Sequence, residues 1–239
     1  KTYRYPIILF VEKPFEQFKN TVSENIHPEL DITYCRVEFS IPSHNIHLDI
    51  PEYYPHPTHG SGPIAIGHPG FSMGYRHMCR FFSGAIYELD ILKDYEYYWR
   101  LDSDSVLTRP ISFDIFQDMD NHQYDYGYVR LDKDHPDVVK GLWETTALFI
   151  KENNINCNMP ESPIMYYTNC ELGRLDFFHG LYMQYYKYLD ATGGIYTNRW
   201  GDAPIKYLGV NICNGKTHQY NIGYHHGTVK ESDQIFEYL

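Results

Sequence analysis

Two aspartates one residue apart follow the aromatic run YEYYWRL: Asp102 and Asp104, separated by Ser103. In an extended chain, alternate side chains point to opposite faces, so both carboxylates are expected on the same face. Oxygen ligands of this kind suit Mn²⁺ or Mg²⁺, which also bind the oxygens of a substrate diphosphate. An Asp-x-Asp triplet also occurs in solvated turns, so other residues must decide between the two interpretations.

A third metal ligand is available near the end of the chain. The segment NIGYHHG places His225 and His226 directly after a glycine-containing turn. One imidazole would complete a carboxylate-bound Mn²⁺ site. Paired histidines in a loop are also commonly hydrogen-bonded or exposed, and spacing alone does not choose between these roles.

Two further clusters carry polar side chains suited to sugar chemistry. Glu171, in YYTNCELG, is expected where an extended segment turns into a helix, a place where the helix dipole favours a carboxylate. Its functional alternative is a carboxylate facing an anomeric carbon, as a nucleophile or as a stabiliser of positive charge. In NRWGDAP, Arg199, Trp200 and Asp202 surround a glycine, so Asp202 is either a helix N-cap or a ligand for a sugar hydroxyl.

The elements that must position these residues alternate between strands and helices. Hydrophobic alternation and β-branched or aromatic runs predict strands, whereas apolar residues at helical spacing predict helices. The predicted strands are residues 5–12, 31–41, 95–107 and 124–130. The predicted helices are residues 14–26, 75–92, 113–119, 141–154 and the later part of 167–194, and residues 203–213 are predicted to be either a further helix or a buried segment. This order predicts an α/β sheet covered by helices, and residues 42–74, rich in Pro, Gly and His, are predicted to be a long loop.

Length and composition limit the class of protein. With 239 residues, 43% hydrophobic and 21% charged, the chain is expected to fold as one large globular domain. A net charge of -11 argues against a nucleic-acid-binding face. Five scattered cysteines without a CxxC pair argue against a zinc ribbon, and no apolar run or signal pattern predicts a membrane span. The 24 tyrosines suit either a rigid core or a sugar-binding cleft.

Five motifs together resemble one family. In this order, YRHMCRFFSG, YYWRLDSD, YTNCELG, GGIYTNRWGDAP and IGYHH are similar to the fungal Kre2/Mnt1-type α-1,2-mannosyltransferases, glycosyltransferase family 15. The resemblance runs from about Tyr5 to His226. It implies a GT-A fold, with one Rossmann-like nucleotide-sugar domain over residues 1–239 and a mixed central sheet flanked by helices. The donor and metal site would lie mainly in residues 1–110, and the acceptor and catalytic part mainly in residues 111–226.

The resemblance also implies a reaction: retaining transfer of mannose from GDP-mannose to a glycan or glycoprotein acceptor, with Mn²⁺ or Mg²⁺ as cofactor. The residues that match the family's functional positions fall into four groups. They are Glu171 as the catalytic carboxylate, Asp102, Asp104 and His226 at the metal, Tyr75, Arg80 and Arg100 at the donor, and Asp202, Arg199 and Trp200 at the acceptor. The implied compartment is the Golgi lumen, although no anchor or signal is visible in this chain and a cytoplasmic location stays open.

Two departures from the family pattern stand out. Asp102 occupies the position of the family's usual glutamate, which shortens the arm that would reach a metal, and Gly227 follows the histidine pair where the family continues with prolines. These departures leave the catalytic centre in place and bear instead on the choice of acceptor and on the Golgi location.

Three alternatives remain open. The first is a GT-A enzyme that uses a UDP-sugar, because fold does not determine substrate. The second is a carbohydrate-binding relative without turnover. The third is a metal-dependent phosphoesterase built on the histidines of the long loop, which are His44, His47, His56, His59 and His68.

Overall fold

The computed structural model describes residues 4–12, 15–25, 29–54 and 71–227, and the chain divides into two compact units, residues 1–41 and 42–239. The first unit is a strand–helix–strand motif: β1 (Ile7–Val11), α1 (Phe15–Asn25) and β2 (Ile32–Arg36). The two strands are parallel, with Ile7 opposite Ile32, as a helical crossover requires. All three elements were predicted, although β2 ends five residues earlier than expected. A single domain for the whole chain stays a prediction.

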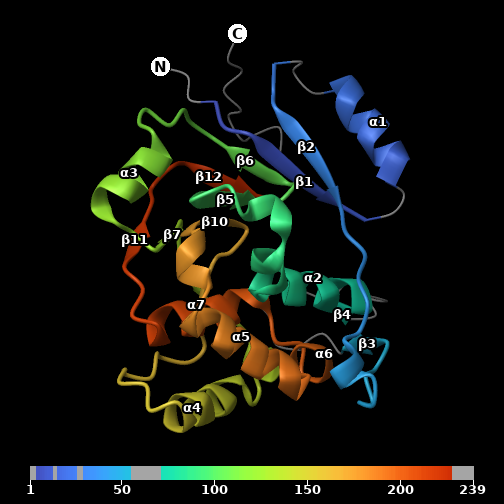
Figure 1. Cartoon of the computed structure of the whole chain (residues 1–239), viewed down its shortest axis with the longest axis vertical. Coiled ribbons are helices and arrows are strands. Elements are labelled where there is room, and N and C mark those ends of the chain that lie inside the picture. Colours follow the sequence, from blue (N-terminus) through green and yellow to red (C-terminus); the bar gives the residue numbers. More distant parts are fainter. Residues whose placement is uncertain (1–3, 13–14, 26–28, 55–70, 228–239) are drawn as a thin grey trace. The chain divides into compact units, whose positions relative to one another are not determined.

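The second unit contains a mixed four-stranded sheet in the order β11-β7-β10-β5 (Figure 1). Its members are β5 (Tyr97–Leu101), β7 (Tyr126–Tyr128), β10 (Cys170–Arg174) and β11 (Thr217–Gln219). Strand β10 is antiparallel to both neighbours, whereas β11 is parallel to β7. This confirms the predicted mixed sheet.

Three two-stranded ribbons surround this sheet. They are β3 (Tyr53–Tyr54) with β4 (Phe71–Ser72), β6 (Ser105–Leu107) with β12 (Tyr224–His226), and β8 (Leu131–Lys133) with β9 (Ile164–Tyr166). All three are antiparallel. The ribbon β6–β12 joins the segment after Asp104 to the histidine pair, since His226 lies opposite Ser105.

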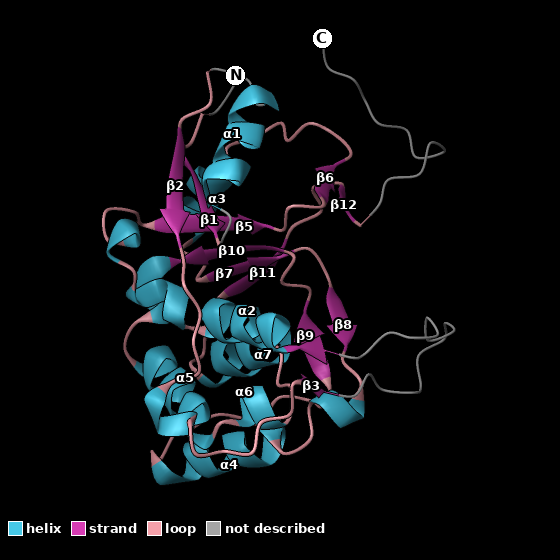
Figure 2. Cartoon of the chain, turned by 90° about the vertical axis from the view of Figure 1, so that its right-hand side faces the viewer, coloured by secondary structure: helices cyan, strands magenta, loops and turns pink. Residues whose placement is uncertain are grey.

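Helices cover both faces of the sheet. Figure 2 shows α2 and α7, with α5, stacked on one side of it. The helices of this unit are α2 (Met73–Ser83), α3 (Ile115–His122), α4 (Leu142–Glu152), α5 (Leu181–Thr192), α6 (Gly194–Thr197) and α7 (Asp202–Ile212). None of the helices in the described ranges is both long and apolar enough to span a bilayer.

Strand β10 divides the interior by simple alternation. Cys170 and Leu172 point toward α3, where they join a hydrophobic cluster with Met119. Glu171 must therefore point to the opposite face, toward α7. A carboxylate in the middle of a central strand is costly to bury unless it is paired, so its partners become an important question.

The predicted helix over residues 75–92 is shorter than expected. Helix α2 ends at Ser83, and two 3₁₀ turns, residues 85–88 and 90–92, continue the chain. At Gly84 a Cβ atom would lie only 2.2 Å from the ring of Tyr186, so only glycine allows α5 to pack this closely. The predicted stop signal at Gly193 is confirmed: its φ is +74°, the left-handed conformation that glycine adopts readily.

Candidate active site

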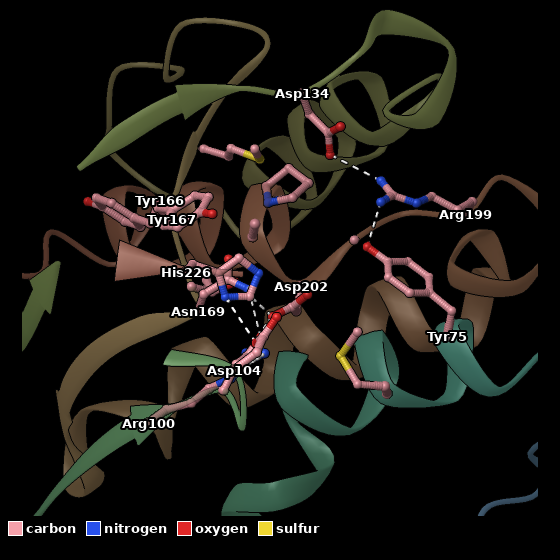
Figure 3. A pocket seen from close by; sticks show the side chains of 17 residues that line it. Tyr75, Arg100, Asp104, Asp134, Tyr166, Tyr167, Asn169, Arg199, Asp202 and His226 are labelled. Atoms are coloured by element: carbon pink, nitrogen blue, oxygen red, sulfur yellow. Dashed lines mark hydrogen bonds and ion pairs between the residues drawn. The ribbon is translucent and has the colours of Figure 1, made fainter. Parts of the chain in front are cut away.

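A pocket of about 360 Å³ lies where α2, the end of β5, the segment before β10, the start of α7 and β12 meet (Figure 3). Its lining includes seven of the ten residues singled out from sequence. These seven are Tyr75, Arg100, Asp102, Asp104, Arg199, Asp202 and His226. Arg80, Glu171 and Trp200 are not part of this lining.

The two aspartates and the second histidine converge, although not by strand alternation. Strand β5 ends at Leu101, and a turn closed by the Ser105 amide donating to the Asp102 carbonyl (2.9 Å) follows it. Ligand atoms of Asp102, Asp104 and His226 all lie within 4.8 Å of one another. In the described part of the chain, this is the one group of three or more such side chains.

The imidazole of His226 fits a metal ligand. Its Nδ1 lies 3.2 Å from Asp104 Oδ1, yet it is buried and makes no hydrogen bond within the described residues. A buried ring nitrogen without a hydrogen-bonding partner is uncommon, because burial of an unpaired polar atom costs free energy. Two carboxylates and an imidazole are a donor set suited to Mn²⁺.

Asn169 supports this cluster and was missed by the sequence reasoning. Its Nδ2 donates to Asp102 Oδ2 at 2.7 Å and lies 3.2 Å from His226 Nε2. It therefore orients both a carboxylate and an imidazole, as partners of metal ligands commonly do. Its one signal in the sequence is its place in the quoted motif YTNCELG, two residues before Glu171.

Arg100 links the metal cluster to the remainder of the pocket. Its Nε donates to Asp102 Oδ1 at 3.0 Å, and its Nη1 donates to Asp202 Oδ2 at 2.6 Å. The guanidinium also lies over the ring of Phe82, 3.7 Å from its centroid. Arg100 thus neutralises two pocket carboxylates from a nearly buried position.

Asp202 lines the pocket but does not cap helix α7. Gly201 is the N-cap and Asp202 is the first helical residue, so the predicted cap position is wrong by one residue. Its carboxylate instead accepts hydrogen bonds from Arg100 and from Thr168 Oγ1 at 2.9 Å. Burial alone would raise the pKa of Asp202, but Arg100 and then Lys206 outweigh burial and hold that pKa below its ordinary value.

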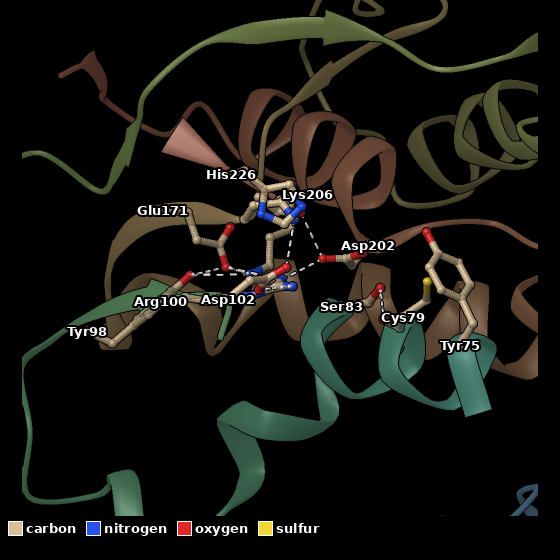
Figure 4. A network of polar contacts seen from close by, with 12 residues as sticks. Tyr75, Cys79, Ser83, Tyr98, Arg100, Asp102, Glu171, Asp202, Lys206 and His226 are labelled. Carbon is tan, nitrogen blue, oxygen red and sulfur yellow. Dashed lines mark hydrogen bonds and ion pairs between the residues drawn. The ribbon is translucent and has the colours of Figure 1, made fainter. Parts of the chain in front are cut away.

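Glu171 lies in the middle of β10, not at a helix N-terminus, so its predicted local structure is wrong. It is fully buried, at 0% exposure. Lys206 forms an ion pair with its Oε1 (Figure 4). Tyr126 donates to its Oε2 at 2.5 Å. Burial and then the charge of Glu171 raise the pKa of Tyr126 well above its ordinary value, so this phenol stays protonated and donates.

A second polar group lines the pocket on the side away from His226 (Figure 3). Arg199 Nη2 donates to the Tyr75 hydroxyl at 2.5 Å, and its Nη1 donates to Asp134 Oδ2 at 3.2 Å. Arg199 also stacks on Phe71, 4.0 Å from the ring centroid. Its φ of +59° is unusual for a residue with a side chain, and such conformations are concentrated at functional sites. Asp134 was not anticipated from sequence.

Two predicted residues have structural partners elsewhere. Arg80 binds both carboxylate oxygens of Asp190, at 2.7 and 2.8 Å, in a two-pronged ion pair between α2 and α5. Trp200 is buried, and its Nε1 donates to the Lys140 carbonyl at 2.8 Å. Neither side chain reaches the pocket in this structure.

The histidine-rich loop provides no metal cluster in the part that the structure describes. His44 lies 3.4 Å from Asp190 Oδ2, where the carboxylate already accepts from Arg80. His56, His59 and His68 lie outside the described residues.

Comparison with known proteins agrees with this geometry. The family model described as glycolipid 2-alpha-mannosyltransferase matches residues 1–235. The chain belongs to this family. Among curated relatives, the probable mannosyltransferase KTR3 of Saccharomyces cerevisiae is 32% identical and the probable mannosyltransferase MNT3 of Candida albicans is 31% identical. Each alignment covers 94% of this chain but only 59% and 62% of the relative, so the chain spans about three fifths of their length.

Solved structures of family members share the fold. The Mn/GDP form of core-mannan synthase A (CmsA/Ktr4) from Aspergillus fumigatus is 28% identical and superimposes with a TM-score of 0.72, over 94% of this chain and 66% of that one. The mannosyltransferase Ktr4p from S. cerevisiae is 25% identical, with a TM-score of 0.75 over 94% and 62%. The fold of this family member is therefore GT-A, as predicted.

Proposed function

We propose that this chain is a retaining, Mn²⁺-dependent mannosyltransferase that uses GDP-mannose and a glycan acceptor, with an α-1,2 linkage as product. One observation carries the proposal: Asp102, Asp104 and His226 converge on a pocket whose other walls are rich in polar groups. Membership of the family and the likeness to a relative solved in its Mn/GDP form support both the metal and the nucleotide. The Golgi lumen stays the predicted compartment.

Asp102, Asp104 and His226 are the residues that would hold the ion. When bound there, Mn²⁺ supplies Lewis-acid stabilisation of the negative charge on a departing diphosphate. Asn169 keeps the Asp102 carboxylate and the His226 ring oriented for this role. Arg100, held against Asp102, adds a positive charge beside the leaving group without needing to move.

Tyr75, which the family resemblance placed at the donor, is bound to Arg199 instead. The wall formed by Tyr75, Arg199, Asp134 and Asp202 is suited to sugar hydroxyls. Carboxylates accept hydrogen bonds from hydroxyls, and a phenol can donate or accept. Burial raises the pKa of Tyr75 above its ordinary value, so the phenol remains neutral. These groups would position an acceptor hydroxyl near the anomeric carbon of the donor.

The surroundings of Glu171 favour same-face attack by the acceptor over a covalent glycosyl-enzyme. Both carboxylate oxygens are engaged, by Lys206 and by Tyr126, and the side chain has no exposed surface. A nucleophile needs an oxygen that can reach the reacting carbon, and Glu171 does not line the pocket. Its carboxylate would come within reach only if this buried ion pair opened.

Calorimetric titration with GDP, UDP and their mannose and glucose conjugates tests the proposal, first with Mn²⁺ and then with EDTA. Manganese-dependent binding confined to GDP and GDP-mannose, followed by transfer to a mannoside acceptor, is the expected result. Preference for UDP would replace the donor but keep the metal site. Absence of nucleotide binding would reject the enzyme and leave a carbohydrate-binding relative.

A further inference from the structure

A buried lysine lies one turn along α7 from the pocket residue Asp202 and has no role in the reaction described so far. Lys206, on α7, is only 1% exposed, and its ammonium forms an ion pair with Glu171. Its Nζ also lies 3.4 Å from the Tyr98 hydroxyl and 5.6 Å from the ring centroid of Tyr87. Removing a lysine charge from water is expensive, so its position requires an explanation beyond packing.

The register of the sheet offers an explanation for the buried position of Lys206. Glu171 on β10 stands directly opposite Arg100 on β5, so their side chains share one face. Arg100 Nη1 is 4.0 Å from Glu171 Oε1 but only 2.6 Å from Asp202 Oδ2. Glu171 and Asp202 are therefore alternative partners for the guanidinium of Arg100. In the structure the guanidinium contacts Asp202, which lines the pocket.

The charge of Lys206 bears on which carboxylate Arg100 contacts, because Lys206 pairs with Glu171. Four buried ionic groups lie together here: Arg100, Lys206, Glu171 and Asp202, two cations and two anions (Figure 4). With Glu171 paired to Lys206, Arg100 balances Asp202 and still contacts Asp102. Without the ammonium, Glu171 would be a buried, unneutralised anion facing Arg100 across the strand pair, and such a charge strongly attracts the nearest cation.

We propose that Lys206 is a positioning residue for the metal site, acting through Arg100. By neutralising Glu171 it leaves the guanidinium bound to Asp102, and so keeps that carboxylate turned toward Asp104 and His226. The inference rests on the proposed function in one respect only, because it assumes that these three side chains bind Mn²⁺.

The test is the affinity for Mn²⁺, measured by electron paramagnetic resonance of the free ion, alone and with saturating GDP. Lys206→Met should weaken Mn²⁺ binding by about 10–100-fold, the range typical of residues that orient metal ligands. The charge-balanced double variant, Lys206→Met with Glu171→Gln, should recover the parent affinity to within about threefold. A general loss of packing would not be rescued by this second substitution.

Arg174→Met is the matched control. Arg174 lies on the same strand as Glu171 and pairs with Asp125, but it does not line the pocket, so the parent affinity for Mn²⁺ is expected. If Lys206→Met does not fold, Glu171→Gln alone takes its place and should keep the parent affinity, since it leaves no anion to attract Arg100.

Three results would overturn the inference: parent-like affinity in Lys206→Met, no recovery in the double variant, or a tenfold loss in Glu171→Gln. A parent chain that binds GDP-mannose but no Mn²⁺ would overturn it together with the metal site, whereas a parent that binds Mn²⁺ without GDP would reject the proposed donor alone.

Discussion

Arg100→Met should be among the most destabilising substitutions at this pocket. The guanidinium contacts Asp202 at 2.6 Å and Asp102 at 3.0 Å, and lies 4.0 Å from Glu171. Removing one partner from a buried ion pair costs about 3–5 kcal/mol, because it leaves an uncompensated charge. This cost is a large share of the free energy of unfolding of a domain, which is only about 5–15 kcal/mol. At about 2–4 °C per kcal/mol for a chain of this size, the melting temperature should fall by roughly 6–20 °C.

The loss should depend on pH, and the sign follows from Asp202. In the parent, Arg100 and Lys206 hold its pKa below the ordinary value despite burial, so this carboxylate stabilises the fold above its unfolded pKa of about 4. That contribution is lost as the pH falls through the lowered, folded-state pKa. In Arg100→Met the Arg100 charge that counteracts burial is gone, so the pKa of Asp202 rises. At low pH this carboxyl becomes protonated, which removes the buried, unpaired charge and reduces the loss of stability in the variant. The gap between parent and variant should therefore be widest near pH 7 and narrow toward pH 4.

Urea unfolding followed by circular dichroism between pH 4 and pH 8 measures this gap. Arg174→Met serves as the control: its side chain is 36% exposed, so loss of its pair with Asp125 should cost about 1 kcal/mol or less. An Arg100→Met protein within about 1 kcal/mol of the parent at pH 7, or a gap that does not change with pH, would refute the electrostatic reasoning.

Other substitutions test separate parts of the structure. His226→Ala should weaken Mn²⁺ binding more than about tenfold, whereas His225→Ala, outside the pocket lining, should leave it unchanged; calorimetry compares the two. Asp134→Asn should raise KM for the acceptor about tenfold in a transfer assay, because it weakens the charge-assisted hydrogen bond that holds Arg199 in the pocket wall proposed for the acceptor. The Mn²⁺ affinity should not change. Gly84→Ala should lower the unfolding free energy by about 1–3 kcal/mol through overpacking. Gly74→Ala meets nothing closer than 3.7 Å and should not destabilise the chain, which urea unfolding of both glycine variants would show.

Most of the fold could be predicted because its elements follow local rules. The strand over residues 5–12, the helix over residues 141–154 and the glycine stop at Gly193 each depend on hydrophobic period or backbone freedom within a few neighbouring residues. The end of α2 could not be predicted in this way. It depends on the ring of Tyr186, about a hundred residues further along the chain, which approaches Gly84 too closely for any other residue.

The metal cluster was predicted by residue type, and the tertiary structure supplied its supports. Carboxylates and imidazoles are common metal ligands, so Asp102, Asp104 and His226 can be proposed as ligands from the sequence. An asparagine has many roles in proteins, so its residue type alone does not indicate a part in a metal site. Asn169 is recognised as a support of this site only because the folded chain places its amide against Asp102 and His226.

The sequence by itself determined which groups are present: a strand ending in two aspartates, a late histidine pair, and family motifs in a set order. Only the tertiary structure decided which of the charged groups face the pocket. Arg80 and Glu171 have the right chemistry for a sugar-nucleotide site, but Asp190 and Lys206 occupy them inside the protein. The reason is physical: a buried charge must be neutralised where it lies, and its partner is chosen by three-dimensional packing that no local pattern records.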